Sequence, residues 1–502
     1  MSICTSGICF DGTLTFTGEA ATITSAPTDE YPNGAVVSRG ENVITSTITW
    51  SNVTKRDVYV ENAGKLTLAK GGITSKTTIQ NGGQMIVTSG GTANTNQVTS
   101  GKLYVSNGGK ANYTTVNSGG YAYNVGGSML GVTLKNGGRA YISKGSVADT
   151  LYISQGGNAY VWSGGTAKNA YTQSFGCLYV YDGGVASGTK LMTNGNLYIY
   201  SGGKAFDTVT SYGVRINMFG GTMSKLNMQR GTIVSAYKGA NVVSTTVDYG
   251  SYLMFGYSGN NCTGVASATN TTVLGGGGLT VITGAKATGI TLAVNGTLTC
   301  NNNATIGGLI TNAGRMNLAG SAGVAANTNI IFNLAGRSVS AMKESYKEAM
   351  LNSYYVARNA NMLITVSANQ SAGSYILANW AGAAKGKFIS LTVGSTKVGY
   401  LTIGNSITHN GKKYSLYNFD DATKSKALIL TVQKINASAG DLMDDPDTLP
   451  DLSMPEFSAN TCVSELSAES LCLDSCAPAI AAAPTLDDLF AKTTQQLPLL
   501  AV

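Results

Sequence analysis

The 502-residue sequence contains 64 glycines and only one histidine, and charged residues make up 12% of it. So few charges leave little for a solvated helical surface or for acid–base catalysis, whereas 43% hydrophobic residues can bury a core, which excludes a wholly disordered chain. The net charge of +7 is uneven, because residues 436–502 carry eleven acids and one base, which leaves +17 for residues 1–435.

The N-terminal residues 1–55 are less periodic than the rest, and we expect them to form a cap over the first coil of a repeat domain. Met1–Asp11 lacks the charged and apolar regions of a secretory signal peptide. Of the eight cysteines, Cys177, Cys262 and Cys300 are isolated in the sequence and are expected to be small buried residues.

Residues 56–337 contain two interleaved series of glycines, each recurring every 18–20 residues. The first series is Gly64, Gly83, Gly101, Gly120, Gly138, Gly157, Gly176, Gly195, Gly213, Gly231 and Gly250. The second is Gly72, Gly91, Gly109, Gly127, Gly145, Gly165, Gly184, Gly203, Gly221 and Gly239. Two turns in each unit of about 19 residues indicate a strand–turn–strand–turn repeat, and glycine reaches the positive φ of tight turns at low cost.

Short runs between these turns alternate aliphatic residues with tyrosine, as in Leu178-Tyr179-Val180-Tyr181, which is the pattern of a strand with one buried face. No proline lies between residues 33 and 445, as continuous β-ladders require. The sequence therefore predicts an all-β fold, a right-handed parallel β-solenoid over residues 56–337. In a recurring Gly-Gly-Xaa-Ala signature, such as Gly137-Gly138-Arg139-Ala140, the alanine is expected to fit inside a corner.

These repeats resemble the passenger stalks of AIDA-type autotransporter adhesins over about residues 56–320, more than half of the chain. The resemblance implies a β-solenoid on the bacterial surface or secreted outside the cell, serving adhesion, self-aggregation or biofilm formation, with Ser/Thr glycosylation in some relatives. The family also has a signal peptide and a C-terminal transmembrane barrel, and the residues after 435 are too few and too acidic for such a barrel.

One tyrosine recurs every 18–19 residues, which places it on the same outer face of successive coils. This series is Tyr104, Tyr123, Tyr141, Tyr160, Tyr179 and Tyr198, and Trp162, Tyr181 and Tyr200 lie two positions further along. Stacked rings stabilise a sheet, which is one interpretation of the ladder. The other is an aromatic strip that docks sugars or a second rod, and we take these nine residues as the candidate binding site.

Beyond the repeats, Met342, Tyr346, Met350 and Tyr354 recur every four residues, which predicts a helix over residues 338–358. A small β module is expected over residues 359–435, with a hairpin turn at His409–Lys412. Its expected strands are Asn361–Val366, Ser374–Ala378, Phe388–Val393, Tyr400–Ile403 and Leu428–Val432. The proline-rich, acidic residues 436–502 predict a flexible tail.

Sites for catalysis and metals are not indicated. Between residues 58 and 340 the acids are Glu61, Asp149, Asp182, Asp207 and Asp248, and His409 lies in a turn. Paired carboxylates are needed for glycoside cleavage, and the nearest approach, Asp207 with Asp248, is two coils apart. Because Cys472 and Cys476 lack further ligands nearby, we expect no metal, no cofactor and no enzymatic activity.

The partners indicated are host or bacterial cell surfaces, polysaccharides or glycans, and the protein itself, because diffuse positive charge attracts acidic surfaces. The bases form no run typical of nucleic-acid binding, and no apolar stretch is long enough for a membrane-spanning helix. An extracellular or bacterial surface location follows from the resemblance. The alternatives are a β-helical carbohydrate-active enzyme and a phage or extracellular fibre protein.

Overall fold

The computed structural model describes residues 3–5, 8–10, 43–257, 263–340, 349–379, 384–420 and 426–435. The chain divides into two compact units, Met1–Glu41 and Asn42–Val502. In the first unit, β1 (Ile3–Thr5) pairs antiparallel with β2 (Ile8–Phe10), so that Cys4 is opposite Cys9 in the register. All the other strands belong to the second unit.

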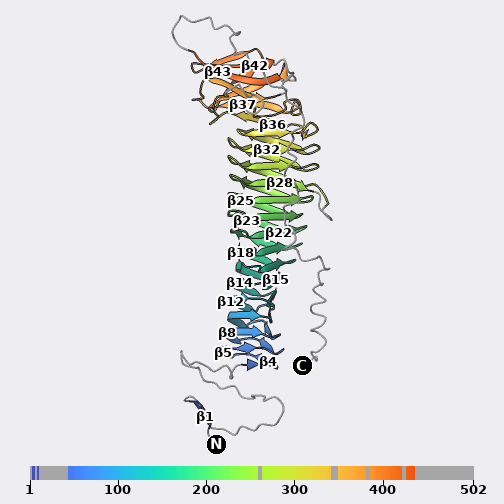
Figure 1. The fold of residues 1–502 in the computed structure, drawn as a ribbon, viewed down its shortest axis with the longest axis vertical. Helices are drawn as coiled ribbons and strands as arrows, with labels where there is room; N and C mark the ends of the chain where they lie inside the picture. The colour runs from blue at the N-terminus through green and yellow to red at the C-terminus, as the bar shows by residue number, and fades with distance from the viewer. Residues whose placement is uncertain are drawn as a thin grey trace. The chain divides into compact units, whose positions relative to one another are not determined.

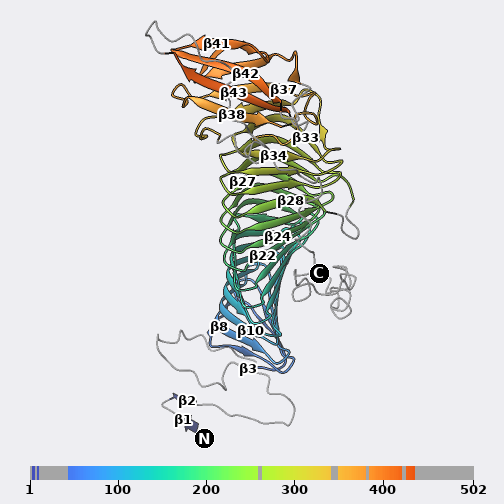
Figure 2. The ribbon, with the colours of Figure 1, turned by 45° about the horizontal axis from the view of Figure 1, so that its top comes forward.

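Parallel strands of the second unit stack in chain order, and the colour gradient of Figure 1 follows this order from β4 through β22 to β36. About fifteen coils of about 19 residues each form a parallel β-solenoid, which confirms the predicted fold class. Each coil contributes to two sheets, here called sheet 1 and sheet 2, and Figure 2 shows the strands of successive coils lying one above another.

Sheet 1 contains fifteen parallel strands. They are β4 (Thr47–Trp50), β7 (Lys65–Leu68), β9 (Gln84–Val87), β11 (Lys102–Val105), β13 (Tyr121–Val125), β15 (Arg139–Ser143), β17 (Asn158–Val161), β19 (Cys177–Val180), β22 (Asn196–Tyr200), β24 (Arg215–Phe219), β26 (Ile233–Tyr237), β28 (Tyr252–Tyr257), β30 (Gly278–Val281), β32 (Thr297–Cys300) and β34 (Arg315–Leu318).

Sheet 2 is parallel from its first strand to β39, and some coils contribute two short strands to it. Its strands are β3 (Val43–Ile44), β5 (Thr54–Arg56), β6 (Tyr59–Val60), β8 (Ile73–Gln80), β10 (Thr92–Thr99), β12 (Lys110–Val116), β14 (Ser128–Leu134), β16 (Val147–Ile153), β18 (Thr166–Thr172), β20 (Val185–Ser187), β21 (Lys190–Leu191), β23 (Lys204–Thr210), β25 (Thr222–Met228), β27 (Asn241–Val247), β29 (Ser267–Val273), β31 (Lys286–Leu292), β33 (Thr305–Asn312), β35 (Gly323–Val324), β36 (Asn329–Asn333), β37 (Asn361–Val366), β39 (Ile389–Val393) and β40 (Thr396–Leu401).

The core is one continuous cluster of inward side chains along the whole stack. In β9, Met85 and Val87 are fully buried while Gln84 and Ile86 are half-buried, and this alternation recurs in most strands. A single coil has too little apolar surface to form a core, so burial depends on its neighbours. The signature alanines lie inside as expected, with at most 1% of each exposed; they are Ala111, Ala140, Ala159, Ala167 and Ala205.

In the glycine pairs at the corners the first glycine adopts the positive φ of the turn and the second allows close approach to the preceding coil, as at the corner Lys135–Gly138. Asn136 and Gly137 both adopt positive φ, 53° and 83°, and Gly138 N–H donates to the Lys135 carbonyl at 3.0 Å, which closes the turn. Gly138 itself is needed for close approach, because a Cβ built there would lie within 3 Å of the Val116 carbonyl of the preceding coil. The second glycine therefore permits the close approach of neighbouring coils at the corner.

A third bend lies inside the long strands of sheet 2. One residue in each has positive φ, including Tyr113 (54°), Gly131 (66°), Thr150 (58°) and Asn169 (50°). The register omits Tyr113 when β10 pairs with β12, so the strand turns at this point and the residue projects from a corner. Most side chains at these bends are exposed, as Tyr113 is at 63%, whereas Thr150 is half-buried.

The structure contradicts the helix predicted over residues 338–358 in the part of it that is described, which is 338–340 and 349–358. Leu351 instead bridges Met316 of β34 and Ala378, as one further rung of sheet 1. Met350 and Tyr354 are buried, as a helix with one apolar face would also require. The four-residue spacing therefore reflects burial along an irregular segment of turns, and residues 341–348 lie outside the described residues.

After Leu351, sheet 1 passes into an antiparallel sheet of four strands, here called sheet 3. Its order is β38 (Gly373–Ala378), β43 (Lys426–Lys434), β42 (Lys412–Asp420) and β41 (Ser406–His409). The predicted hairpin turn is present, since Asn410 and Gly411 have φ of 50° and 69° between β41 and β42. The strand expected at residues 400–403 is instead β40, which ends at Leu401.

The solenoid extends beyond the predicted boundaries at both ends. Parallel pairing begins at β3 and β4, so the coils include residues that were predicted to belong to an N-terminal cap ending at residue 55. At the other end, β37 pairs parallel with β36 and continues the stack into the module predicted for residues 359–435. Residues 11–42 and 436–502, which include the predicted tail, lie outside the described residues.

Candidate functional site

The predicted tyrosine series forms a column on the outer face of sheet 1. Parallel pairing aligns its six members in register, one from each of β11, β13, β15, β17, β19 and β22. Ring centroids are 4.9 to 5.1 Å apart and neighbouring planes differ by 8° to 12°. The constant spacing follows from the strand separation of a parallel sheet, which is about 4.8 Å.

A second column runs beside the first, two residues further along each strand. Trp162 stacks on Tyr181 at 4.1 Å, and Tyr181 stacks on Tyr200 at 4.6 Å, as predicted. The column then continues through Phe219, Tyr237 and Tyr257, which sequence reasoning missed. Successive members from Tyr200 onward are 18–20 residues apart, which is a usable signal in the sequence, although the tyrosine series of the first column ends at Tyr198.

The ladder is less exposed than predicted. Tyr160 and Tyr179 retain only 7% and 2% exposure, and together with Cys177 they form an apolar cluster separate from the main core. Tyr123, Tyr141, Tyr160 and Tyr179 each have a stacked ring on both faces, as do Tyr181 and Tyr200 of the second column. A spacing of about 5 Å leaves no room for a sugar between two rings, so these rings can offer a partner only their edges and hydroxyl groups.

Burial also controls the ionisation of these phenols. Desolvation, reinforced by neighbouring phenols, raises the pKa of Tyr160 to about 12, and burial beside Cys177 raises the pKa of Tyr179 further. For Tyr141, burial raises the pKa while Arg139, through charge and a hydrogen bond, opposes the rise. These three phenols are therefore neutral at physiological pH, and they provide hydrogen-bonding hydroxyls but no general base.

The charge beside the columns is positive. The position two residues before the first column carries Lys65, Lys102, Arg139 and Arg215 in the aligned strands, and the Arg139 guanidinium lies 5.9 Å from the Tyr121 ring centroid. The fifteen strands described for sheet 1 contain no Asp or Glu. This face therefore combines aromatic edges with positive charge, which suits a neutral or acidic partner.

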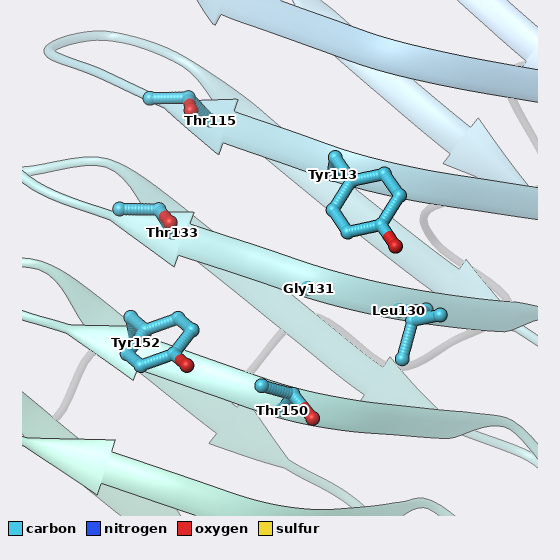
Figure 3. A pocket seen from close by; sticks show the side chains of 7 residues that line it. All are labelled: Tyr113, Thr115, Leu130, Gly131, Thr133, Thr150 and Tyr152. Atoms are coloured by element: carbon cyan, nitrogen blue, oxygen red, sulfur yellow. The ribbon is translucent and has the colours of Figure 1, made fainter.

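Sheet 2 carries an apolar hollow that sequence reasoning also missed. Figure 3 shows Tyr113, Leu130 and Tyr152 around Gly131, and the hollow has a volume of about 420 Å³. Gly131 makes room for it, since a Cβ there would lie 2.9 Å from the Tyr113 ring. Tyr152 stacks on Tyr171 at 5.2 Å, which makes a short second ladder. Tyr113 falls outside the tyrosine series, so the repeat did not single it out.

Asp207 and Asp248, the nearest approach to a carboxylate pair in the sequence, each contact a neighbouring group. The Asp207 carboxylate lies 3.5 Å from the Lys225 ammonium on the surface of sheet 2, and the Asp248 carboxylate accepts the Tyr249 N–H in a turn. Among the described residues there is no group of three or more His, Cys, Asp or Glu side chains placed to hold a metal ion. His409 ends β41 beside the hairpin turn.

Within the ranges that the structure covers, no helix has the length and apolar character needed to cross a bilayer. Cys177 and Cys300 are buried, as predicted, while Cys262 lies outside the described residues.

Comparison with solved structures finds a similar protein. The crystal structure of a hyper-glycosylated fragment of TibA, residues 55–350, whose glycosylation is catalysed by TibC, matches with a TM-score of 0.50 and 30% sequence identity. The match covers 97% of that fragment and 53% of this chain. No protein-family model and no curated protein sequence matches the chain.

Proposed function

Because the chain belongs to the same β-solenoid family as the TibA fragment, we propose that it is an adhesin-like stalk of the AIDA-type autotransporter kind, displayed on or secreted from a bacterial cell. It contacts cell surfaces, glycans or further copies of itself and so promotes adhesion, aggregation or biofilm formation. Its role is binding rather than catalysis.

One observation carries this proposal: about fifteen coils repeat the same surface positions in register along a single stack. Each repeated position offers a partner one weak contact. When many such contacts engage together, the effective concentration at each later contact is high, and overall avidity exceeds single-site affinity by ~10²–10⁴. A stiff array of coils is suited to this because the contacts need no ordering at binding.

The two aromatic columns and the bases beside them are the surface we assign to these contacts. With ring faces covered, the contact is with edges and hydroxyls, which favours an extended, flat partner such as a glycan layer or the sheet of a second copy. The half-buried rings, including Tyr104, Tyr123, Tyr141 and Tyr198, carry the contact, whereas Tyr160 and Tyr179 support them from within.

Display of the chain on a non-aggregating bacterium tests the proposal. Replacing Tyr104, Tyr123 and Tyr141 with Ser is expected to lower aggregation about tenfold, because avidity multiplies the lost contacts. The matched control replaces the stacked pair Tyr152 and Tyr171 of sheet 2, which removes the same kind of ring from another face. Display levels and circular dichroism check that both variants fold. If display of the wild-type chain causes no aggregation or adhesion, the proposed stalk function is wrong. If both variants lose aggregation equally, the aromatic columns are not the contact surface.

Modification by sugars is a further part of the proposal, since the similar TibA fragment is hyper-glycosylated. Exposed serines begin the turn Ser-Gly-Gly at one corner of several coils, as at Ser89, Ser163 and Ser201. Such hydroxyls are open to a transferase without unfolding the coil. Peptide mass spectrometry of the natively produced protein is expected to find sugar-sized additions at these serines, and unmodified peptides throughout would contradict it.

A further inference from the structure

A cleft separate from the aromatic columns lies where the parallel stack ends. It has a volume of about 350 Å³, within the ~300–1,000 Å³ range of small-molecule sites. Its walls come from the turns that lead into β37 and β39 and from the edge strand β40. We infer that this cleft binds an acidic saccharide, a sugar chain bearing carboxylates. This inference goes beyond the stalk function, because the site is independent of the columns.

Three cations line the cleft. The Arg358 guanidinium lies 4.2 Å from the Tyr355 ring centroid and donates to the Tyr355 carbonyl at 2.8 Å. The Lys397 ammonium donates to the Tyr400 hydroxyl at 2.7 Å, and Lys387 is exposed in the turn before β39. None of the three forms an ion pair with a described residue. Their charges are thus available to carboxylates, and two of them are held in place by a neighbouring tyrosine.

The Phe388 ring in this cleft is 74% exposed and stacks on no other described ring, unlike the rings of the columns. Tyr400 is 53% exposed, and the Lys397 ammonium lies over its ring, 4.4 Å from the centroid. Tyr354, the third ring of the lining, is buried. An exposed apolar ring is unfavourable in water, and a bound partner that covers the ring removes this cost. The flat apolar face of a sugar ring fits such a surface, while the cations beside it fit the sugar's carboxylate.

Amide groups supply the third kind of contact. Strands β36 and β37 align Asn329 with Asn361, and Asn361 Nδ2 donates to Asn329 Oδ1 at 3.1 Å. This bond fixes both side chains and leaves Asn361 Oδ1 as an acceptor and Asn329 Nδ2 as a donor at the surface. An adjacent donor and acceptor match neighbouring sugar hydroxyls. A free inorganic anion would need only the cations, so the amides and rings favour a saccharide.

The surroundings reinforce the attraction. Residues 349–435 contain nine Lys and Arg residues and two acids. A local excess of positive charge raises the concentration of an anionic polymer near the cleft and speeds its encounter. The same positive charge would also attract the acidic residues 436–502 of the chain. A synthetic peptide of those residues therefore serves as a separate probe in the experiment.

The test is calorimetric titration of the full chain at physiological salt. The probes are short oligogalacturonates, their methyl-esterified neutral counterparts, inorganic phosphate, and a synthetic peptide of residues 436–502. Oligogalacturonate is expected to bind, and the neutral ester at least about tenfold more weakly, since charge-assisted hydrogen bonds are lost. The double variant R358Q/K397Q and the variant F388A are each expected to weaken binding about tenfold.

Lys413→Gln is the matched control, because Lys413 is an exposed base on β42 of the same module but does not line the cleft. It is expected to leave affinity unchanged. The inference is overturned if oligogalacturonate does not bind, or if the neutral ester or phosphate binds as tightly as oligogalacturonate does. It is also overturned if K413Q loses as much affinity as R358Q/K397Q. Binding of the peptide of residues 436–502 without binding of any oligogalacturonate would likewise overturn it. All the substituted side chains are exposed, so each variant is expected to keep the melting temperature of the wild type. A loss of affinity at unchanged melting temperature is then a loss of binding and not of folding.

Discussion

Substituting alanine at two adjacent glycines, Gly137 and Gly138, would separate turn conformation from close approach between coils. A Cβ on Gly138 would lie 2.1 Å from the Val116 carbonyl oxygen, about 1.3 Å inside ordinary contact. The obstacle is backbone, which cannot rotate away. A Cβ on Gly137 meets no atom within 4 Å, and its only strain is the positive φ of 83°.

The magnitudes follow from these contacts. Overpacking costs roughly 1–3 kcal/mol, and moving the Val116 carbonyl also strains the hydrogen bond that it accepts from Lys135 N–H, for about 1–3 kcal/mol more. Gly138→Ala is thus expected to destabilise by about 2–6 kcal/mol. Gly137→Ala carries the left-handed cost of about 1–2 kcal/mol, partly offset by a less flexible unfolded chain, which leaves about 1 kcal/mol.

Hydrogen exchange read by mass spectrometry suits this comparison, because solenoids do not unfold as a single two-state unit. In Gly138→Ala, amide protection is expected to fall in the coils on either side of residue 138 while distant coils keep theirs. Gly137→Ala is expected to change protection only at the corner. Equal protection in the two variants, or a greater loss in Gly137→Ala, would refute the division of tasks between paired glycines.

Three further outcomes are expected. The pKa of Tyr160 is raised to about 12 from an ordinary value of 10, so the folded state keeps this proton to a higher pH than the unfolded state does. The stabilisation that this shift provides is therefore fully present below pH 10 and is lost as the pH rises through 12. Absorbance at 295 nm should show phenols that ionise at high pH, together with unfolding. Burial raises the pKa of Cys300 to about 12, so iodoacetamide at pH 8 should leave that thiol unmodified until denaturant is added, as peptide mapping would report. Gly411→Val should destabilise sheet 3, because Gly411 has φ of 69° in the β41–β42 hairpin, whereas Asn410→Gly should be tolerated; limited proteolysis at this turn would distinguish them.

Periodicity in the sequence was enough to predict the solenoid, because the same constraint acts on every coil. Each turn of the chain needs a glycine where backbones approach, as at Gly138, and an alternating strand such as Leu178–Tyr181 to fill the core. Parallel pairing in register then follows, and it places the tyrosine series in one column without further information. The glycine and alternation patterns are reliable predictors because they recur in about ten successive coils.

Tertiary structure alone decided what the repeat does not encode. The four-residue spacing of Met350 and Tyr354 suited a helix, yet Leu351 joined sheet 1, since an open sheet edge at Met316 offered hydrogen bonds. Burial of Tyr179 depends on rings from two neighbouring coils and a second column. The cleft at the end of the stack unites segments near residues 329, 358, 388 and 400 that share no sequence period, and only folding brings their charges and rings together.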